Sequence, residues 1–288
     1  RFGHSYNKAM SKTGMSSNFL SQNSNKRSLT LNLRTPEGQE IFKKLAKTAD
    51  VVVQNLRTGT MEKYGLGYEH LSAINPRIVV CSITAYGNTG PKQRHPAYDP
   101  VVQAASGMMS INGTPETAPV KIGPPVIDYG AGLAASFAIA TALFQREREG
   151  KDGQGQYIDV SMLDTALALM SSYVTDYFAT GNPPGPRGNE PASRSPSAGT
   201  YDTKDGKLTL GANEDHQYER LCRALGLAQV LDDVLKVFVL NRDLLNKQTT
   251  VEEFALLYDE LKEFEGIDER FNQLNTATIR QMLGFATE

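Results

Sequence analysis

The spacing of apolar and polar positions changes from strand-like to helical early in the chain. Residues 28–33 alternate apolar and polar side chains, which predicts a half-buried strand. In the next segment, Thr35 is a predicted N-cap and Pro36 takes the first helical position. Ile41 and Leu45 lie four residues apart, so we expect a helix that buries the face carrying them.

Short apolar runs and helical segments then follow one another along the chain. Runs rich in β-branched residues predict buried strands at 51–53, 78–83 and 156–162. Helical spacing predicts a short helix at 68–74 and a longer one at 163–178. This alternation of strand and helix is typical of an α/β domain with a doubly wound, Rossmann-like parallel sheet.

The stretch 124–149 lies at the centre of this pattern. A short apolar run ends at Asp128, and a long helical segment rich in Gly and Ala follows it. Small residues let other backbones approach closely, so we expect this helix to be deeply buried. An Asp at a helix start is a good N-cap. The same helix end stabilises an ionised carboxylate, which would keep Asp128 available as a nucleophile. The local sequence leaves both interpretations open.

The pattern changes again in the last third of the chain. Residues 181–199 hold five of the fourteen prolines and almost no apolar side chain, which predicts a linker. A hairpin follows with its turn at Lys204, Asp205 and Gly206, and helical patterns continue from Glu214. We therefore predict a large Rossmann-like domain over 1–180, the linker, and a smaller α+β domain over 200–288.

Composition and charge exclude several classes of function. Thirty basic against 32 acidic residues give a net charge of −2, so no nucleic-acid partner and no acidic membrane surface is predicted. The apolar window 130–145 is short and rich in Gly and Ala, which argues against a membrane span. Cys81 and Cys222 have no metal-like spacing, and neither do the four histidines, so no metal site is predicted. Free cysteines favour a reducing, cytoplasmic location.

Two glycine-based motifs lack the context that their chemistry needs. The segment 150–156 leaves a helix and enters a strand, whereas phosphate-binding loops leave a strand and enter a helix. It predicts a helix C-cap and a turn instead. The sequence contains no G-x-S-x-G elbow and no G-x-G-x-x-G opening a helix, so hydrolase and dinucleotide-binding functions lack their signatures.

Several separate motifs resemble one family in the same order and with close spacing. The family is class III CoA-transferases, the formyl-CoA and carnitine-CoA transferase group, and the resemblance runs over residues 25–180 and more weakly to 226. The matching segments are NKRSLTLNLRTPEGQEIFKKLAKTADVVVQN, YGLGYEHLSAINPRIVVCSITAYG, YDPVVQAASGM, GPPVIDYGAGLAASFAIATALFQRE and GQGQYIDVSMLD.

The resemblance implies an acyl-CoA:carboxylate CoA-transferase. In that family the acid matching Asp128 attacks an acyl-CoA thioester and forms an aspartyl-acyl anhydride. An aspartyl-CoA thioester follows, and a carboxylic acid acceptor then takes the activated position. The implied partners are an acyl-CoA donor and a carboxylic acid acceptor. Coenzyme A is a substrate here rather than a permanently bound cofactor.

The resemblance also implies a set of residues that contact CoA. Arg34 is the implied phosphate partner, because a guanidinium binds phosphate with two parallel hydrogen bonds. Without the resemblance, Asn55 is a turn residue, and Arg57 and Lys63 are solvated surface charges. The implied CoA contacts are Leu31, Asn32, Leu33, Arg34, Asn55, Leu56, Arg57, Lys63, Pro96, Ala97, Tyr98 and Asp99.

Two alternatives remain beside transfer. The related α-methylacyl-CoA racemases place a His directly before the Asp of the YD pair, since two-base racemisation needs a second titratable group. Tyr98 stands at that position and His95 lies three residues away, which favours the transferase. The second alternative is a non-catalytic CoA-binding fragment.

The match also leaves parts of the family pattern without a counterpart. The family's first strand and helix, and its C-terminal return, have no equivalent here, so we expect a truncated chain. Family members form interlocked dimers, which implies a homodimer for the complete protein. The family's locations are cytoplasmic, or mitochondrial or peroxisomal in a eukaryote.

Overall fold

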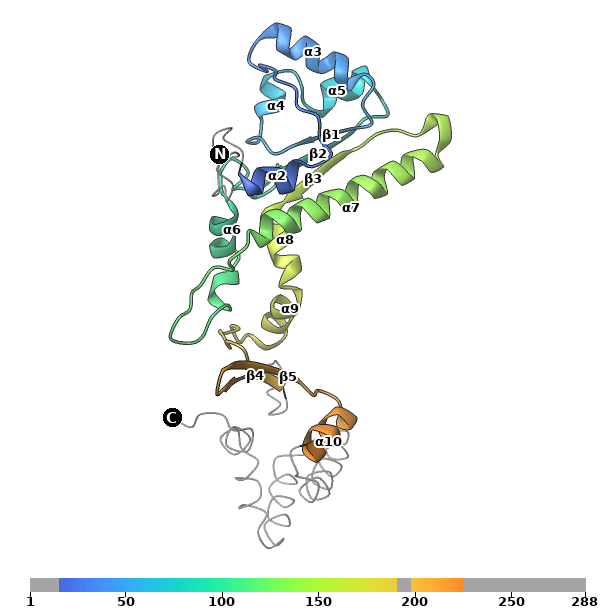
Figure 1. The fold of residues 1–288 in the computed structure, drawn as a ribbon. Helices are drawn as coiled ribbons and strands as arrows, with labels where there is room; N and C mark the ends of the chain where they lie inside the picture. The colour runs from blue at the N-terminus through green and yellow to red at the C-terminus, as the bar shows by residue number, and fades with distance from the viewer. Residues whose placement is uncertain (1–15, 191–197, 225–288) are drawn as a thin grey trace, which may run out of the picture. The chain divides into compact units, whose positions relative to one another are not determined.

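The computed structural model describes residues 16–190 and 198–224 (Figure 1). The chain divides into two compact units. The first contains residues 1–106 and 123–175, and the second contains residues 107–122 and 176–288.

A three-stranded parallel sheet forms the centre of the first unit. β1 pairs with β2 and β2 pairs with β3, so the strands stand in sequence order. Helical segments connect successive strands, as parallel pairing requires. The predicted α/β fold with a Rossmann-like parallel sheet is confirmed. The strands are β1 (Val51–Gln54), β2 (Val79–Thr84) and β3 (Tyr157–Ser161).

Three helices cover one face of the sheet: α3 (Pro36–Ala46), α4 (Thr60–Lys63) and α5 (Tyr68–Ile74) (Figure 1). Their buried residues form one apolar cluster with β2, which contains Ala46, Met61, Leu66, Leu71, Ile78 and Val80. The predicted cap of α3 is confirmed, because the Thr35 hydroxyl accepts a hydrogen bond from Gly38 N at 3.2 Å. The predicted buried face is wrong. Phe42 packs against the cluster, whereas Ile41 and Leu45 are exposed.

The chain before α3 differs from the prediction. Residues 28–33 form no strand and pair with no strand of the described chain. β1 stands at the edge of the sheet and pairs with β2 alone. Alternation was therefore misleading, since a strand also needs a neighbour to satisfy its backbone groups. The polar stretch 1–24 has no apolar periodicity and predicts an irregular arm, but a helix, α2 (Ser17–Asn23), lies within it. The Ser16 hydroxyl caps this helix by accepting a hydrogen bond from Phe19 N.

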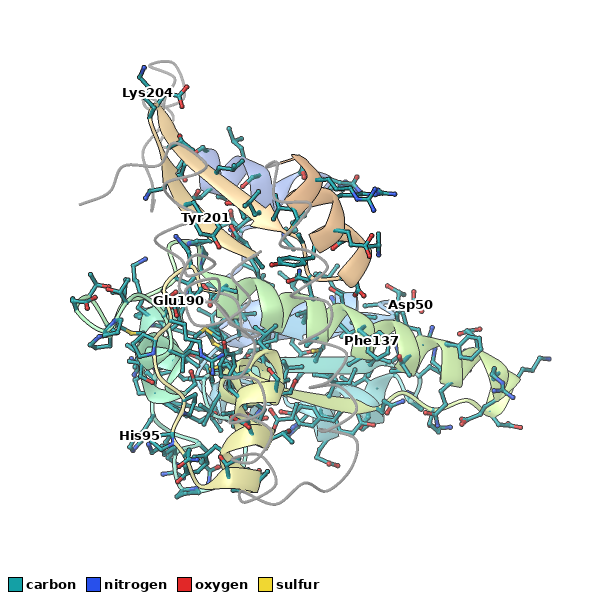
Figure 2. The ribbon with its side chains drawn as sticks, turned by 90° about the horizontal axis from the view of Figure 1, so that it is seen from below. Asp50, His95, Phe137, Glu190, Tyr201 and Lys204 are labelled. Atoms are coloured by element: carbon teal, nitrogen blue, oxygen red, sulfur yellow. The ribbon has the colours of Figure 1, made fainter. Side chains whose placement is uncertain are left out.

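The long helix α7 (Val126–Arg148) covers the opposite face of the sheet (Figure 1). Ala131, Ala135 and Ala142 are buried, as expected of small residues that let a helix lie close to strands. The expectation of deep burial all round is wrong. Ile127 is buried, but several other large apolar side chains of α7 are exposed, and Phe137 (Figure 2) is 76% exposed in the described chain. Leu133 and Phe144 are exposed beside it.

The argument from length against a membrane span is also corrected. α7 has 23 residues and a mean hydropathy of 1.5, so length and composition alone would allow it to cross a membrane. Only 22% of its most apolar window is buried. The helix nevertheless packs on β2, β3 and α8 through its small residues, as the core helix of an α/β protein does.

The helix predicted at 163–178 is broken into two. α8 (Met162–Leu169) has Met170 as its C-cap, and α9 (Ser171–Thr180) follows directly. The Ser161 hydroxyl caps α8 by accepting from Asp164 N at 3.1 Å. Residues 181–190 have no regular structure, and the rest of the predicted linker up to residue 197 lies outside the described residues.

The predicted hairpin is confirmed in the second unit. β4 (Ala198–Thr203) pairs antiparallel with β5 (Gly206–Gly211), and Thr203 stands opposite Gly206, which leaves Lys204 and Asp205 as the loop. One turn of 3-10 helix covers Met108–Ser110, and α10 (Asp215–Ala224) follows the hairpin. The helices predicted beyond it lie outside the described residues. Cys81 and Cys222 are both buried, and neither forms a disulfide in the described chain.

Candidate functional site

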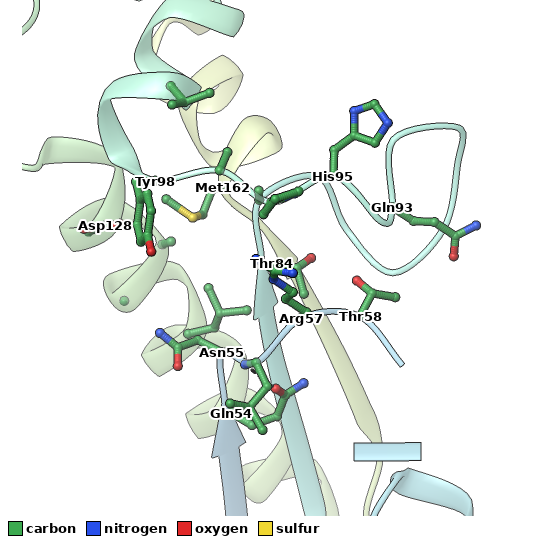
Figure 3. A pocket seen from close by; sticks show the side chains of 18 of the residues that line it. Gln54, Asn55, Arg57, Thr58, Thr84, Gln93, His95, Tyr98, Asp128 and Met162 are labelled. Carbon is green, nitrogen blue, oxygen red and sulfur yellow. Dashed lines mark hydrogen bonds between the residues drawn. The ribbon is translucent and has the colours of Figure 1, made fainter. Parts of the chain in front are cut away.

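A pocket of about 730 Å³ opens at the carboxyl ends of β1 and β2 (Figure 3). This is the edge where ligands bind in parallel α/β sheets. Its walls are the loop after β1, the loop between β2 and α6 (Asp99–Ala105), and the first turns of α7. A volume of this size accommodates a substantial part of an organic ligand.

The structure brings one group of the predicted site residues together and leaves another apart. The pocket is lined by seven of them: Asn55, Leu56, Arg57, Pro96, Ala97, Tyr98 and Asp128. The other six do not line it: Leu31, Asn32, Leu33, Arg34, Lys63 and Asp99. Leu31 to Arg34 were expected at the end of a strand that does not form, and Lys63 lies in α4.

Asp99, unlike its neighbour Tyr98, does not line the pocket. It was assigned to the loop that contacts CoA, but its side chain is buried behind the pocket wall, with 4% of the residue exposed. Its Oδ2 accepts hydrogen bonds from the backbone N–H groups of Ile127 at 2.7 Å and Asp128 at 3.1 Å. Its Oδ1 accepts from Gln103 Nε2 at 2.6 Å. Asp99 is therefore the side chain that caps α7.

This cap settles the local geometry of Asp128. α7 begins at Val126, so Asp128 is the third residue of the helix rather than its N-cap. The residue before the helix is Pro125, which has no side-chain cap. Since Asp99 already binds the amides of Ile127 and Asp128, the carboxylate of Asp128 is left to line the pocket.

The electrostatic environment of Asp128 differs from the expectation. A helix N-terminus was expected to favour its ionised form. Instead, burial raises the pKa of the Asp128 carboxyl, and the negative charge of Asp99 raises that pKa further. A carboxylate with a raised pKa is a stronger base and nucleophile once it is ionised.

A row of polar side chains crosses the sheet below the pocket. Gln54, Ser82 and Asp159 stand side by side on β1, β2 and β3. Gln54 Nε2 donates to Ser82 Oγ at 2.5 Å, and Asn88 closes the row by donating its side-chain amide to Asp159 Oδ1 and its backbone N–H to Asp159 Oδ2, both at 2.8 Å.

This polar row (Gln54, Ser82, Asn88 and Asp159) holds both loops of the pocket. The Gln54 side chain accepts from the backbone N–H of Leu56 at 2.7 Å, which fixes the loop after β1. Asn88 belongs to the loop that carries His95 and Tyr98 further along. The row therefore determines how these two walls stand relative to one another.

Sequence reasoning missed several residues that line the pocket. Arg94 and His95 come from the loop before α6, and Gln54 and Thr84 end β1 and β2. The rule that ligands bind at the carboxyl ends of parallel strands could have identified Gln54 and Thr84. Arg94 and His95 carried no local signal.

The pocket combines cations with hydroxyl groups that have no partner. Arg57 and Arg94 supply positive charge. Among the described residues, the buried hydroxyls of Thr58 and Thr84 make no hydrogen bond, although both line this pocket. Buried polar groups are normally satisfied, so these two hydroxyls are suited to a ligand. An anionic ligand with polar groups fits this environment.

Other reactive groups in the described chain are poor candidates for chemistry. No cluster of three His, Cys, Asp or Glu side chains that could hold a metal occurs in residues 16–190 and 198–224. Cys81 lies within β2, and burial, together with the charge of Asp159, raises the pKa of its thiol, which disfavours the nucleophilic thiolate. Asp128 is thus the best-placed nucleophile around the pocket.

Comparison with known proteins identifies a family. The sequence model of the family described as CoA-transferase family III matches residues 3–283. This match confirms the resemblance that the motifs indicate. The succinate–glutarate CoA-transferase of Agrobacterium fabrum is 40% identical over 211 residues, covering 73% of this chain and 52% of that protein. The succinyl-CoA:glutarate CoA-transferase of Homo sapiens is 36% identical, with 75% and 48% covered.

Solved structures and further relatives agree with this match. A crystal structure of a CaiB/BaiF family protein from Brucella suis superimposes with a TM-score of 0.62 at 33% identity, covering 83% of this chain and 65% of that one. The succinyl-CoA–D-citramalate CoA-transferase of Chloroflexus aurantiacus is 38% identical over 210 residues. The chain spans about half the length of the curated relatives it matches.

Proposed function

Because this chain belongs to CoA-transferase family III, we propose that its pocket transfers coenzyme A from an acyl-CoA to a free carboxylic acid, with Asp128 as the nucleophile. The observation that carries the proposal is the carboxylate of Asp128 in a pocket with two arginines, while Asp99 caps the helix in its place. Arg57 and Arg94 supply the charge that a phosphate-bearing ligand needs.

The first half of the reaction transfers CoA to the protein. An Asp128 oxygen attacks the thioester carbon, the new C–O bond forms an anhydride, and the C–S bond breaks to release CoA thiolate. The thiolate then attacks the side-chain carbonyl carbon of Asp128. This step forms an aspartyl-CoA thioester and releases the donor as a free carboxylate.

The second half runs the same steps toward the acceptor. The acceptor carboxylate attacks the aspartyl thioester, which forms a second anhydride and releases CoA thiolate. The thiolate attacks the acceptor's carbonyl carbon, and the new acyl-CoA leaves with Asp128 regenerated as a carboxylate. No proton is gained or lost overall, because each nucleophile and each leaving group is an anion.

Short dicarboxylic acids are the proposed donor and acceptor class. Several relatives are named for succinate or succinyl-CoA with glutarate, D-citramalate or mesaconate, all of which carry two carboxylates. A further relative is named for acetyl-CoA and oxalate, of which only oxalate is a dicarboxylic acid. A second carboxylate could pair with an arginine that the CoA phosphates leave available. The homodimer and the cytoplasmic location remain predictions.

The test is a transfer assay with a matched control. Succinyl-CoA is mixed with isotopically labelled glutarate, and labelled glutaryl-CoA is quantified for wild type, Asp128→Asn and Asp164→Asn. Asp164 is also the third residue of a helix, α8, but it does not line the pocket. We expect label transfer by wild type and Asp164→Asn, and none by Asp128→Asn. Full transfer by Asp128→Asn would refute the proposal.

The same preparation separates the alternatives. Saturable CoA binding without label transfer by wild type would favour the non-catalytic CoA-binding protein. A racemase would exchange the α-proton of a 2-methylacyl-CoA in heavy water without any acceptor acid. His95 is the one histidine that lines the pocket within the described chain, so His95→Gln would abolish that exchange.

A further inference from the structure

We propose that Asp99 is a positioning residue that holds Asp128 ready for attack. This proposal rests on the function proposed above and adds a second carboxylate to it. Asp99 begins α6 and Asp128 lies in the first turn of α7, so one side chain joins the starts of two helices.

The hydrogen bonds of Asp99 use both of its oxygens inside the protein. Oδ2 accepts from Ile127 N and Asp128 N, and Oδ1 accepts from Gln103 Nε2. Gln103 is itself fully buried. A carboxylate this deep is costly unless it is hydrogen-bonded, and here three N–H groups and the positive end of a helix surround it. The arrangement is rigid because each partner is a backbone amide or a buried side chain.

Asp99 first determines where the Asp128 carboxylate can go. The first amides of a helix lack partners within the helix, and an acid near the helix start commonly turns back to bind them. In α7, Asp99 takes the amides of Ile127 and Asp128. Val126 N bonds to Pro124 O, and the N-cap residue Pro125 has no N–H. The Asp128 side chain therefore has no such bond to form and stays on the pocket side.

Asp99 also links Asp128 to the pocket wall. The residue before it, Tyr98, lines the pocket and is the N-cap residue of α6. A shift of Asp99 would thus move Tyr98 and the first turn of α7 together. Displacements of about 1 Å between reacting groups can cost two orders of magnitude in rate.

Asp99 acts on Asp128 through its charge as well as through its hydrogen bonds. It raises the pKa of the Asp128 carboxyl, in addition to the larger effect of burial. Four other charged or titratable groups line the pocket. Arg57 comes from the loop after β1, and the loop before α6 supplies Arg94, His95 and Tyr98. The residues that α2 and α8 contribute, Gln22 and Met162, have no titratable side chain. The test is made in a His95→Gln background, so that the only imidazole lining the pocket in the described chain is removed.

The experiment uses three substitutions that separate charge, hydrogen bonding and general destabilisation. Asp99→Asn keeps the shape and an acceptor oxygen but removes the charge. Asp99→Ala removes both. Ser161→Ala deletes the cap of α8, a comparable cap outside the proposed mechanism. The readouts are the pH dependence of single-turnover adduct formation at Asp128 with succinyl-CoA, the pKa of Asp128 by ¹³C NMR, and the Kd for CoA.

For Asp99→Asn we expect the acidic limb of adduct formation and the NMR pKa of Asp128 to move together to lower pH. For Asp99→Ala we expect adduct formation about ten- to a hundred-fold slower per folded molecule, with the Kd for CoA within about two-fold of wild type. Ser161→Ala should lower stability and leave the rate and the pH profile unchanged.

The outcomes distinguish this proposal from the function on which it rests. If Asp99→Asn shows the wild-type pKa for Asp128 and the wild-type pH profile, Asp99 is only a structural cap and the proposal fails. That variant decides the matter even if Asp99→Ala does not fold. If wild type forms no adduct at Asp128, the proposed function fails. The role of Asp99 is tested separately by NMR, because an unchanged pKa of Asp128 in Asp99→Asn would refute that role whether or not an adduct forms.

Discussion

The two ends of α7 carry charged groups of opposite sign and use them differently. At the C-terminal end, the Arg146 side chain is only 7% exposed, donates to Arg77 O at 2.8 Å, and pairs with Asp50 (Figure 2) at 2.9 Å. At the N-terminal end, the buried acid Asp99 caps the helix, and a second acid, Asp128, faces the pocket. Both ends match the helix dipole.

The difference lies in which charges find partners inside the protein. Arg146 bonds to a backbone carbonyl and two carboxylates, so its charge fastens α7 to the start of the sheet. Asp128 has a carboxylate neighbour instead of a cation, and its pKa is raised. A charge held this way destabilises the fold and favours reaction, so we assign the C-terminal end to stability and the N-terminal end to chemistry.

The largest expected effect comes from neutralising the acid at the N-terminal end. Asp128→Asn should lower transfer activity by at least about a thousand-fold, as removal of a nucleophile does in other covalent enzymes. It should also raise the free energy of unfolding at neutral pH. A raised carboxyl pKa means that the folded protein binds this proton more tightly, so the stability it contributes is present at low pH and is lost as pH rises through the raised value.

Urea unfolding at several pH values measures this prediction. Wild type should lose stability relative to Asp128→Asn as pH rises above the ordinary carboxyl range, and the two should converge at low pH. Asp164→Asn, at the equivalent position of α8, should follow wild type. A variant that is less stable than wild type at neutral pH would show that Asp128 is a structural residue.

The cation at the other end should show the reverse behaviour. Arg146→Met keeps the length of the side chain but removes its hydrogen bonds and its ion pair, and should cost about 2 kcal/mol in the free energy of unfolding. Activity per folded molecule should stay within about two-fold of wild type. Arg148→Met, whose side chain lies in the same last turn, is the control and should change stability by less than about 0.5 kcal/mol.

The polar row below the pocket should give a smaller effect on binding. Asp159→Asn replaces a charged acceptor of two Asn88 hydrogen bonds with a neutral side chain and should raise the Kd for CoA about three- to ten-fold. Calorimetry with CoA measures this change. Asp152→Asn makes the same change of charge in the turn after α7, away from the polar row. This variant should bind CoA like wild type. Equal affinity in both variants would show that the row does not position the loops.

The smallest effect is expected at Thr84. Thr84→Val removes a buried hydroxyl that has no partner within the described chain, so stability should stay equal or rise slightly. If the hydroxyl binds the ligand, the Kd for CoA should rise about two- to five-fold, in line with one lost neutral hydrogen bond. Lower stability with unchanged affinity would mean that the hydroxyl has a structural partner instead.

The comparison of the helix ends also shows what sequence reasoning could reach. Local signals were sufficient where a few neighbouring residues determine the structure. Thr35 with Pro36 predicted the start of α3, and β-branched runs predicted all three strands of the sheet. The resemblance placed Asn55 to Arg57 among the CoA contacts, and these residues follow β1 and line the pocket, at the edge where parallel sheets bind ligands.

Predictions failed where the structure depends on residues far apart in the sequence. Asp99 caps amides 28 and 29 residues away, so no local pattern identified it as the cap. The alternation at 28–33 predicted a strand, but no pairing partner is present in the described chain. The outer face of α7 is apolar like its inner face, so its pattern alone could not show that Phe137 is exposed.

The most direct test of the central claim is to trap the intermediate on Asp128. The protein is incubated with succinyl-CoA, treated with borohydride, digested, and mapped by mass spectrometry. Borohydride reduces an aspartyl-CoA thioester to an alcohol, so the residue becomes homoserine. We predict homoserine at position 128 in wild type, none in untreated protein, and unmodified Asp99 and Asp164 in both. Transfer activity together with an unmodified Asp128 would contradict the account.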